Sequence, residues 1–426
     1  MGRRRQGGKP QGGLSVMAVT IIGAGIVGVA AAIYLQREGH AVTLIDGSAP
    51  GEGTSFGNAG SLAPGSIIPL ALPGTIRQVP KWIIHPLGPL SLSWRKLPGL
   101  TPWFFHFWRA CNPRTVARTA AAMRSLNGPS VDRYTDLLAG AGASELLVHD
   151  SGITVYRSER SFDGSAWARG VRADNGVKIE LLDAATIGAR EPALDPGYRW
   201  GFTLPEGGYV RNPGRVVQAL ARHFVARGGT LVTAVVRDFV RAEGRVKALV
   251  TDRGEIPVDL LVLAAGVGSR ALAAKLGVRA PLTSERGYHI QIPAPAVTVR
   301  HQVADGDLRF VATPMEGGLR ISGTSEFCGI DAPPNWARAA ALGRLAPRLL
   351  PGIKTEPHSR WAGHRPSTPD GRPYIGAVPG LARLFLAYGH GHWGLMAAPA
   401  TGQVIADLVA GRPPRIDLAP FRPDRY

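Results

Sequence analysis

The stretch AVTIIGAGIVGVAAAIYLQREGHAVTLID, residues 18–46, constrains the fold of this chain more than any other. It opens with an apolar run that predicts a buried strand, and Gly23, Gly25 and Gly28 follow in a G-x-G-x-x-G array. Residues 26–36 are apolar or small with good helix propensity, and a second apolar strand closes the stretch. This strand–helix–strand unit is typical of a Rossmann-type fold, in which the glycines allow a tight turn and close helix–strand packing.

The same unit predicts what binds there. A helix N-terminus offers unpaired backbone N–H groups and the positive end of the helix dipole, which suit a phosphate. Asp46 comes 18 residues after Gly28, where a carboxylate reaches ribose hydroxyls. We therefore predict an adenine dinucleotide in contact with Gly23, Ala24, Gly25, Ile26, Val27, Gly28 and Asp46.

Elements suited to a nucleotide recur in the middle and at the end of the chain. DLLVLAAGVGS predicts a buried strand and a small-residue turn, and the last 70 residues predict a strand, a Gly/His turn and a helix. The predicted fold class is α/β, with a Rossmann-type domain assembled from residues 17–75, 200–270 and 355–426. An α+β substrate domain on a mainly antiparallel sheet is inserted as residues 76–199 and 271–354, and residues 1–16 form a flexible basic leader.

Composition excludes several classes of protein. The two cysteines, Cys111 and Cys328, form no C-x-x-C pair, which argues against a disulfide scaffold, a zinc site or a redox dithiol, so we predict no metal. The formal charge of +18 comes from the leader and from dispersed arginines, without a block of six basic residues. We therefore expect no specific nucleic-acid binding.

Residues 79–111 combine four of the nine tryptophans with basic side chains. This pattern is typical of a bilayer interface, and also of a hydrophobic helix that covers a second lobe, which we favour. The chain has no apolar run of 18 residues, and its leader has no signal-peptide core. We expect a cytoplasmic protein, with peripheral contact at the inner face of the membrane through 79–111 as the open alternative.

Three motifs resemble the D-amino-acid oxidase-like superfamily of flavoproteins, and most closely the bacterial D-amino-acid dehydrogenases. The first is GAGIVG with Asp46, where many relatives have Glu, and the second is GTSFGNAGSLAPG at 53–65. The third combines WAGHRPSTPDGRPYIG at 361–376 with LFLAYGHGHWGLMAAPATG at 384–402. The similarity runs from about residue 17 to the C-terminus. It implies FAD as the cofactor.

Small residues, hydroxyls and an amide in the second motif suit hydrogen bonding to a flat polar ring, and the helix that begins near Gly394 suits the pyrimidine end of a flavin. No cysteine lies between Ser359 and Gly402, so we expect FAD to be non-covalent. With the resemblance, the further predicted contacts of FAD are Thr54, Ser55, Asn58, Ala59, Gly60, Val236, Ala265, Gly266, Arg365, Gly391, His392, Trp393, Gly394 and Leu395.

Oxidation of an amino acid by a flavin is mainly a positioning problem, because the α-C–H must face the ring. Arginine suits the substrate carboxylate through its bidentate fork, and Arg365 is our first candidate, with an ion pair to Asp370 as its alternative structural role. The resemblance places Tyr288 and His289 on the substrate side and His392 over the flavin. Arg286 and Arg320 are weaker candidates.

We therefore expect FAD-dependent oxidation of a D-amino acid, with D-proline or 4-hydroxy-D-proline as options, to an imine that hydrolyses. The acceptor of electrons would be a membrane quinone or another flavoprotein. Two alternatives stay open: a glycine/sarcosine-type oxidase that uses oxygen, and the FAD-bearing subunit of a hetero-oligomeric dehydrogenase. The sequence leaves the oligomeric state undetermined.

Overall fold

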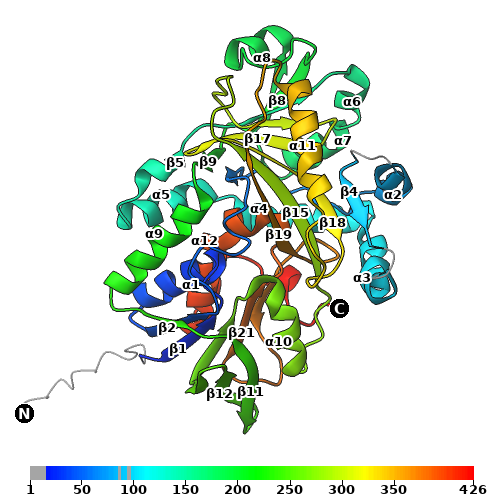
Figure 1. Ribbon diagram of the computed structural model, residues 1–426. Coiled ribbons are helices and arrows are strands. Elements are labelled where there is room, and N and C mark those ends of the chain that lie inside the picture. The colour runs from blue at the N-terminus through cyan, green and yellow to red at the C-terminus, as the bar shows by residue number, and fades with distance from the viewer. Residues whose placement is uncertain (1–15, 85–87, 94–96) are drawn as a thin grey trace, which may run out of the picture.

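The computed structural model describes residues 16–84, 88–93 and 97–426 (Figure 1). The basic leader, apart from Val16, lies outside the described residues, and so do Trp94, Arg95 and Lys96 of the aromatic–basic segment. Two sheets organise the rest, one parallel and one mainly antiparallel. In Figure 1 the parallel sheet lies below the antiparallel one, and chain segments far apart in sequence meet in each.

The parallel sheet confirms the predicted Rossmann-type fold. Its strands run in the order β10 (Thr230–Thr233), β2 (Ala41–Asp46), β1 (Ala18–Ile22), β14 (Leu260–Leu263), β21 (Leu384–Tyr388) and β20 (Tyr374–Ala377), of which only β20 is antiparallel to its neighbour. Helix α1 (Ile26–Arg37) is buried on nearly every side because it packs between α12 (Gly394–Val409) and α9 (Pro213–Ala226). This burial explains why its sequence is apolar throughout, without an amphipathic stripe.

The second sheet has nine strands. Along its main path the order is β19 (Ser359–Ser367), β15 (Thr283–Ile292), β18 (Gly318–Phe327), β17 (Phe310–Met315), β16 (Val303–Asp305), β6 (Ile153–Tyr156), β8 (Trp200–Thr203) and β7 (Glu180–Asp183), and β4 (Leu90–Leu92) pairs with β18. Helix α11 (Trp336–Leu349) packs on β15 and β18. The sheet takes in β8 and β19, which the sequence boundaries had assigned to the nucleotide-binding part.

The remaining elements cover these sheets. Helices α4 (Pro113–Asn127) and α5 (Ser130–Gly140) pack on α12, although we had assigned them to the substrate part, because their apolar faces join the core of the parallel sheet. One small sheet consists of β11 (Val236–Ala242), β12 (Arg245–Thr251) and β13 (Gly254–Pro257). Another consists of β3 (Ser61–Leu62), β9 (Gly208–Val210) and β5 (Leu147–Val148). The other helices are α2 (Thr75–Ile84), α3 (Leu97–Ala110), α6 (Glu159–Asp163), α7 (Ala166–Asp174), α8 (Ala184–Arg190) and α10 (Ser269–Lys275). Among the described helices, none has both the length and the apolar character needed to cross a bilayer.

Candidate active site

The three glycines of the first turn have different surroundings. Gly23 has φ +112°, and a Cβ there would lie 2.4 Å from the carbonyl oxygen of Ala264. A Cβ on Gly28 would lie 1.8 Å from the carbonyl oxygen of Gly23. A Cβ on Gly25, by contrast, would meet only the hydroxyl of Ser55, at 3.5 Å. Gly23 and Gly28 therefore serve the turn and the packing of α1, while Gly25 leaves backbone open to a ligand.

The start of α1 is arranged for an anion. No side chain of the cap residue closes it, and the Ile26 N–H donates to the Ser55 hydroxyl at 3.1 Å. Asp46 accepts from the Ala24 N–H at 2.7 Å, which holds this carboxylate beside the turn. A cavity of about 280 Å³ lies here, and its lining includes the predicted residues Gly23, Ala24, Gly25, Ile26, Val27, Asp46, Thr54, Ser55, Asn58, Ala265, Gly266, Gly391, Gly394 and Leu395.

A second cavity of about 520 Å³ adjoins the first and shares Thr54, Asn58 and Gly391 with it. The predicted residues Ala59, Arg365 and His392 line this second cavity. The Thr54 hydroxyl donates to the carbonyl oxygen of His364 at 2.8 Å, which ties the GTSFGNAG segment to β19. The two cavities together fit an extended dinucleotide whose pyrophosphate lies at α1 and whose ring lies near the start of α12.

Four predicted cofactor contacts line neither cavity. Gly28 packs against the turn, and Gly60 has φ +78° with its N–H on the Asn58 side-chain oxygen at 2.8 Å. Trp393 is buried, and its indole N–H donates to the Ser66 hydroxyl at 3.3 Å. Val236 begins β11 and packs on the core beneath the parallel sheet. Direct contact with FAD stays a prediction for these four positions.

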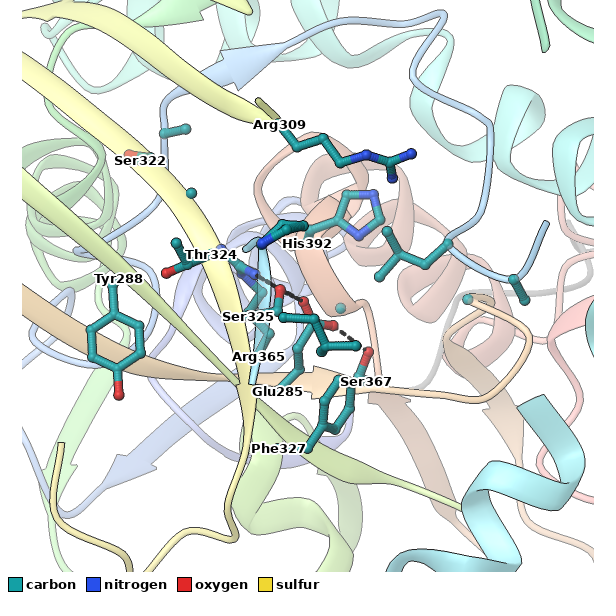
Figure 2. A pocket seen from close by; sticks show the side chains of 18 of the residues that line it. Glu285, Tyr288, Arg309, Ser322, Thr324, Ser325, Phe327, Arg365, Ser367 and His392 are labelled. Atoms are coloured by element: carbon teal, nitrogen blue, oxygen red, sulfur yellow. Dashed lines mark hydrogen bonds and ion pairs between the residues drawn. The ribbon is translucent and has the colours of Figure 1, made fainter. Parts of the chain in front are cut away.

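A buried carboxylate that the sequence analysis missed organises the larger cavity. Glu285 and Arg365 face each other across β15 and β19, and their side chains form an ion pair at 2.9 Å. The hydroxyls of Ser325 and Ser367 donate to Glu285 at 2.6 and 2.9 Å (Figure 2). Burial raises the pKa of Glu285, but the Arg365 cation and these hydroxyls outweigh it, so the pKa lies below its ordinary value.

Arg365 is oriented by this arrangement. Its guanidinium lies over Gly287, where a Cβ would come within 2.4 Å of Nη2. Its Nη1 donates to Glu285 and, at 3.2 Å, to the Ser325 hydroxyl. Among the described residues no hydrogen-bond partner occupies Nε or Nη2, and the side chain keeps 25% of its surface exposed. The alternative pairing with Asp370 is absent there, because Arg372 and Arg425 take that carboxylate.

His392 stands at the junction of α12 with the larger cavity (Figure 2). Burial lowers the pKa of its imidazole to about 4, and Arg365 lowers it further while Glu285 raises it. The imidazole is therefore uncharged at neutral pH. An uncharged ring suits a positioning role better than that of a general acid.

Tyr288 and His289 do not share a side of the sheet, because successive residues of a strand point to opposite faces. The Tyr288 hydroxyl donates to Glu326 and accepts from the Asn335 N–H at 2.9 Å, and burial raises its pKa to about 12. Figure 2 shows its ring directed away from Arg365. Tyr288 lies among the residues that line the larger cavity, and because its hydroxyl is engaged by Glu326 its role as a substrate contact stays a prediction.

His289 contacts the GTSFGNAG segment at Gly57. Its ring stacks on Trp361 with centroids 5.2 Å apart, and its Nδ1 lies 3.2 Å from the carbonyl oxygen of Gly57. Burial lowers the pKa of His289 to about 3, with the nearby Arg320 cation adding to the effect. This uncharged, enclosed ring suits a positioning group, and its place on the substrate side stays a prediction.

The two weaker arginine candidates also have other tasks. Arg286 pairs with Glu326 at 3.3 Å on the side of β15 that faces α11. Arg320 donates to the carbonyl oxygens of Phe56 and Asn58 at 3.0 and 2.7 Å and so fixes the GTSFGNAG segment. Both guanidiniums are buried by these contacts, which leaves Arg365 as the candidate of the three at the cavity.

Helices α2 and α3 form the outer wall of the larger cavity. Trp103 is buried in it, stacks on Phe107 with centroids 5.2 Å apart, and donates its indole N–H to the Ser367 carbonyl oxygen at 3.0 Å. The opposite side of α3 leaves Phe105 and Trp108 51% and 60% exposed. Helix α3 of the aromatic–basic segment therefore packs against β18 of the antiparallel sheet and also presents an exposed aromatic face.

Sequence comparison agrees with the geometry. Residues 18–408 match the DAO family, described as FAD dependent oxidoreductase. A protein of Bradyrhizobium diazoefficiens named D-amino-acid oxidase is 40% identical over 418 residues, which cover 96% of this chain and 98% of that protein. A protein of Rhizorhabdus wittichii named D-amino acid dehydrogenase is 34% identical over 424 residues, which cover 96% of this chain and all of that protein.

Solved structures show the same fold. Glycine oxidase from Geobacillus kaustophilus aligns with a TM-score of 0.73 at 24% identity, over 96% of this chain and 98% of its own. L-Proline dehydrogenase from P. horikoshii aligns with a TM-score of 0.73 at 19% identity, over 96% and 97%. The match over most of its length and the two adjoining cavities lead to one conclusion: the chain belongs to the DAO family of FAD-dependent oxidoreductases.

Proposed function

We propose that this protein oxidises the α-C–N bond of a D-amino acid, with cyclic substrates such as D-proline or 4-hydroxy-D-proline included. The names of the two relatives support the choice of D-amino acids. The observation that carries the proposal is Arg365, whose free Nε/Nη2 edge lies at the larger cavity beside the predicted flavin contacts. When bound, FAD supplies the two-electron oxidant that accepts hydride from the α-carbon.

The residues of the chain position the substrate for this reaction. Arg365 holds the α-carboxylate through the edge that Glu285 leaves free, and the Glu285 ion pair fixes the plane of the guanidinium. The imidazole of His392 is uncharged at neutral pH and therefore adds no charge of its own to this end of the cavity. The aromatic wall from α3 keeps bulk water from the reacting atoms, and the imine product hydrolyses to a 2-oxo acid and ammonia, or a cyclic imine opens.

For the electron acceptor we propose a membrane quinone or another flavoprotein that docks on α3, with the protein held peripherally at the inner face of the membrane. The exposed Phe105 and Trp108 support this docking, and Arg109 stacks over Phe105 at 5.9 Å. The chain carries no aspartate or glutamate between Glu52 and Asp132, so the wall is basic. Such a surface suits an anionic bilayer.

Anaerobic titration of the purified holoprotein tests the reaction. Loss of the visible flavin band with D-amino acids, and not with L-amino acids, glycine or sarcosine, is the expected result. Readmission of oxygen or of a soluble quinone then identifies the acceptor by the rate at which the band returns. Bleaching by glycine or sarcosine alone, with fast return in oxygen, would replace our proposal by an oxidase of that type.

Arg365→Met is the variant that tests the carboxylate contact. It should retain bound flavin but lose roughly 10²-fold or more in the rate of bleaching, because one bidentate charge-assisted contact is worth several kcal/mol. Arg360→Met is the matched control, since Arg360 lies on the same strand but is exposed and stacks on Trp336. Equal losses in both variants would remove Arg365 from the substrate site.

A further inference from the structure

A second arginine faces the larger cavity from the turn between β16 and β17. Arg309 has φ +59°, a left-handed conformation that glycine or asparagine adopts more readily than arginine. Its guanidinium lies over the ring of Trp82 from α2, 4.6 Å from the ring centroid. Figure 2 shows the Arg309 guanidinium on one side of the His392 imidazole and Arg365 on the other.

The charge of Arg309 is uncompensated within the described residues. The two acids of its own turn are engaged elsewhere: Asp305 accepts from the Tyr198 hydroxyl, and Asp307 accepts from the Arg157 backbone N–H at 2.9 Å. The wall from α2 and α3 offers no carboxylate, because no acidic residue occurs between Glu52 and Asp132. Of the described residues that line the cavity, Glu285 is the one acid, and it is paired with Arg365.

The cavity therefore has two cationic ends of different character. At the Arg365 end the charge is balanced by Glu285, and the remaining donors hydrogen-bond a carboxylate. At the Arg309 end one full positive charge is held on an aromatic ring beside apolar walls such as Val311. Ser322 and Thr324 also line this cavity, and their hydroxyl oxygens are buried without a hydrogen-bond partner in the described part of the chain.

We propose that Arg309 binds a carboxylate in the side chain of the substrate, so that the enzyme prefers acidic D-amino acids. This inference rests on the proposed function, in which Arg365 holds the α-carboxylate. A substrate that spans the cavity then places its second carboxylate at the uncompensated guanidinium. The cation–π contact with Trp82 holds that guanidinium at the wall of the cavity.

D-Glutamate and D-glutamine test this assignment because they have nearly the same shape and differ in the charge of the side chain. In the holoprotein we expect kcat/KM for D-glutamate to exceed that for D-glutamine. Arg309→Met should lower that ratio by roughly tenfold to a hundredfold, the range expected for one charge-assisted hydrogen-bonded contact. Arg309→Lys keeps the cation and should retain part of the preference. The control is Arg199→Met, since Arg199 also stacks on a tryptophan, Trp200, but does not line the cavity.

A binding measurement separates failure of this inference from failure of the proposed reaction. Glutarate carries the two carboxylates but no amine, so its Kd from flavin difference spectra or calorimetry does not depend on turnover. Weaker glutarate binding in Arg309→Met than in wild type, with flavin content and melting temperature retained, supports the assignment. An unchanged glutamate-to-glutamine ratio overturns it, and so does an equal loss on both substrates, which would place Arg309 on the α-carboxylate. Absence of bleaching by any D-amino acid refutes the reaction, while the glutarate comparison still reports on Arg309.

Discussion

Gly25 and Gly28 stand three residues apart in one motif, and alanine should have opposite consequences at the two positions. At Gly28 the added carbon would lie 1.8 Å from the carbonyl oxygen of Gly23, more than an ångström inside van der Waals contact. That oxygen belongs to backbone fixed by the Gly23 N–H bond to Ile45 at 2.7 Å, so the helix must move instead. Because α1 is packed between α12 and α9, such a movement disturbs the core.

We expect Gly28→Ala to cost about 3 kcal/mol or more of folding free energy, at the upper end for overpacking of a rigid site. In a chain of this size that corresponds to a fall of about 3 °C or more in apparent melting temperature. At Gly25 the added carbon meets only the Ser55 hydroxyl at 3.5 Å, and φ is −71°, which alanine adopts readily. Gly25→Ala should therefore leave the apoprotein as stable as wild type.

The loss in Gly25→Ala should appear in cofactor binding. A methyl group there stands where a pyrophosphate approaches the backbone, and loss of one charge-assisted hydrogen bond costs about 1.5–3 kcal/mol. The affinity for FAD should fall roughly tenfold to a hundredfold. Melting of the apoproteins at one scan rate, together with FAD titration, separates the two effects. A Gly25→Ala protein with wild-type FAD affinity, or a Gly28→Ala apoprotein with wild-type melting temperature, would refute this division of roles.

Two further predictions follow from buried charges. Burial raises the pKa of Asp370, but Arg425 and Arg372 outweigh this effect and hold the pKa at about 2, below its ordinary 3.8. The charged Asp370 therefore stabilises the fold above about pH 4, and that contribution is lost as the pH falls toward 2. Arg425→Met should therefore melt lower than wild type at pH 7, and the gap should narrow below pH 4; a gap independent of pH would contradict the ion-pair account. The pKa of His392 is about 4, so the pH profile of kcat/KM between pH 5.5 and 8 should have the same shape in His392→Gln as in wild type. An inflection near pH 6.5 in wild type that the variant lacks would show instead that the imidazole titrates in this range.

The sequence by itself determined the parallel sheet and the cofactor end of the site. Residues 18–46 carry their own pattern of strand, glycine turn, helix and strand, and these short-range features suffice to predict the βαβ unit. A local signal also lies at the start of α9, where Pro213 is the first helical residue and the Asn212 side chain accepts from the Arg215 N–H at 3.1 Å. Local spacing decides such elements, because the strand, the glycine turn, the helix and its cap are each encoded by a short run of consecutive residues.

The substrate end was decided only by the tertiary structure. Arg365 was identified from its motif, but its partner Glu285 lies 80 residues earlier and meets it only through the register of β15 against β19. The same register turns Tyr288 toward Glu326 and places His289 under Gly57, an orientation that residue type does not reveal. The setting of Arg309 depends on Trp82 of a distant helix and on the lack of an ion-pair partner among the described residues. Long-range pairing sets which charges are balanced and which face the cavity, and no local pattern encodes that balance.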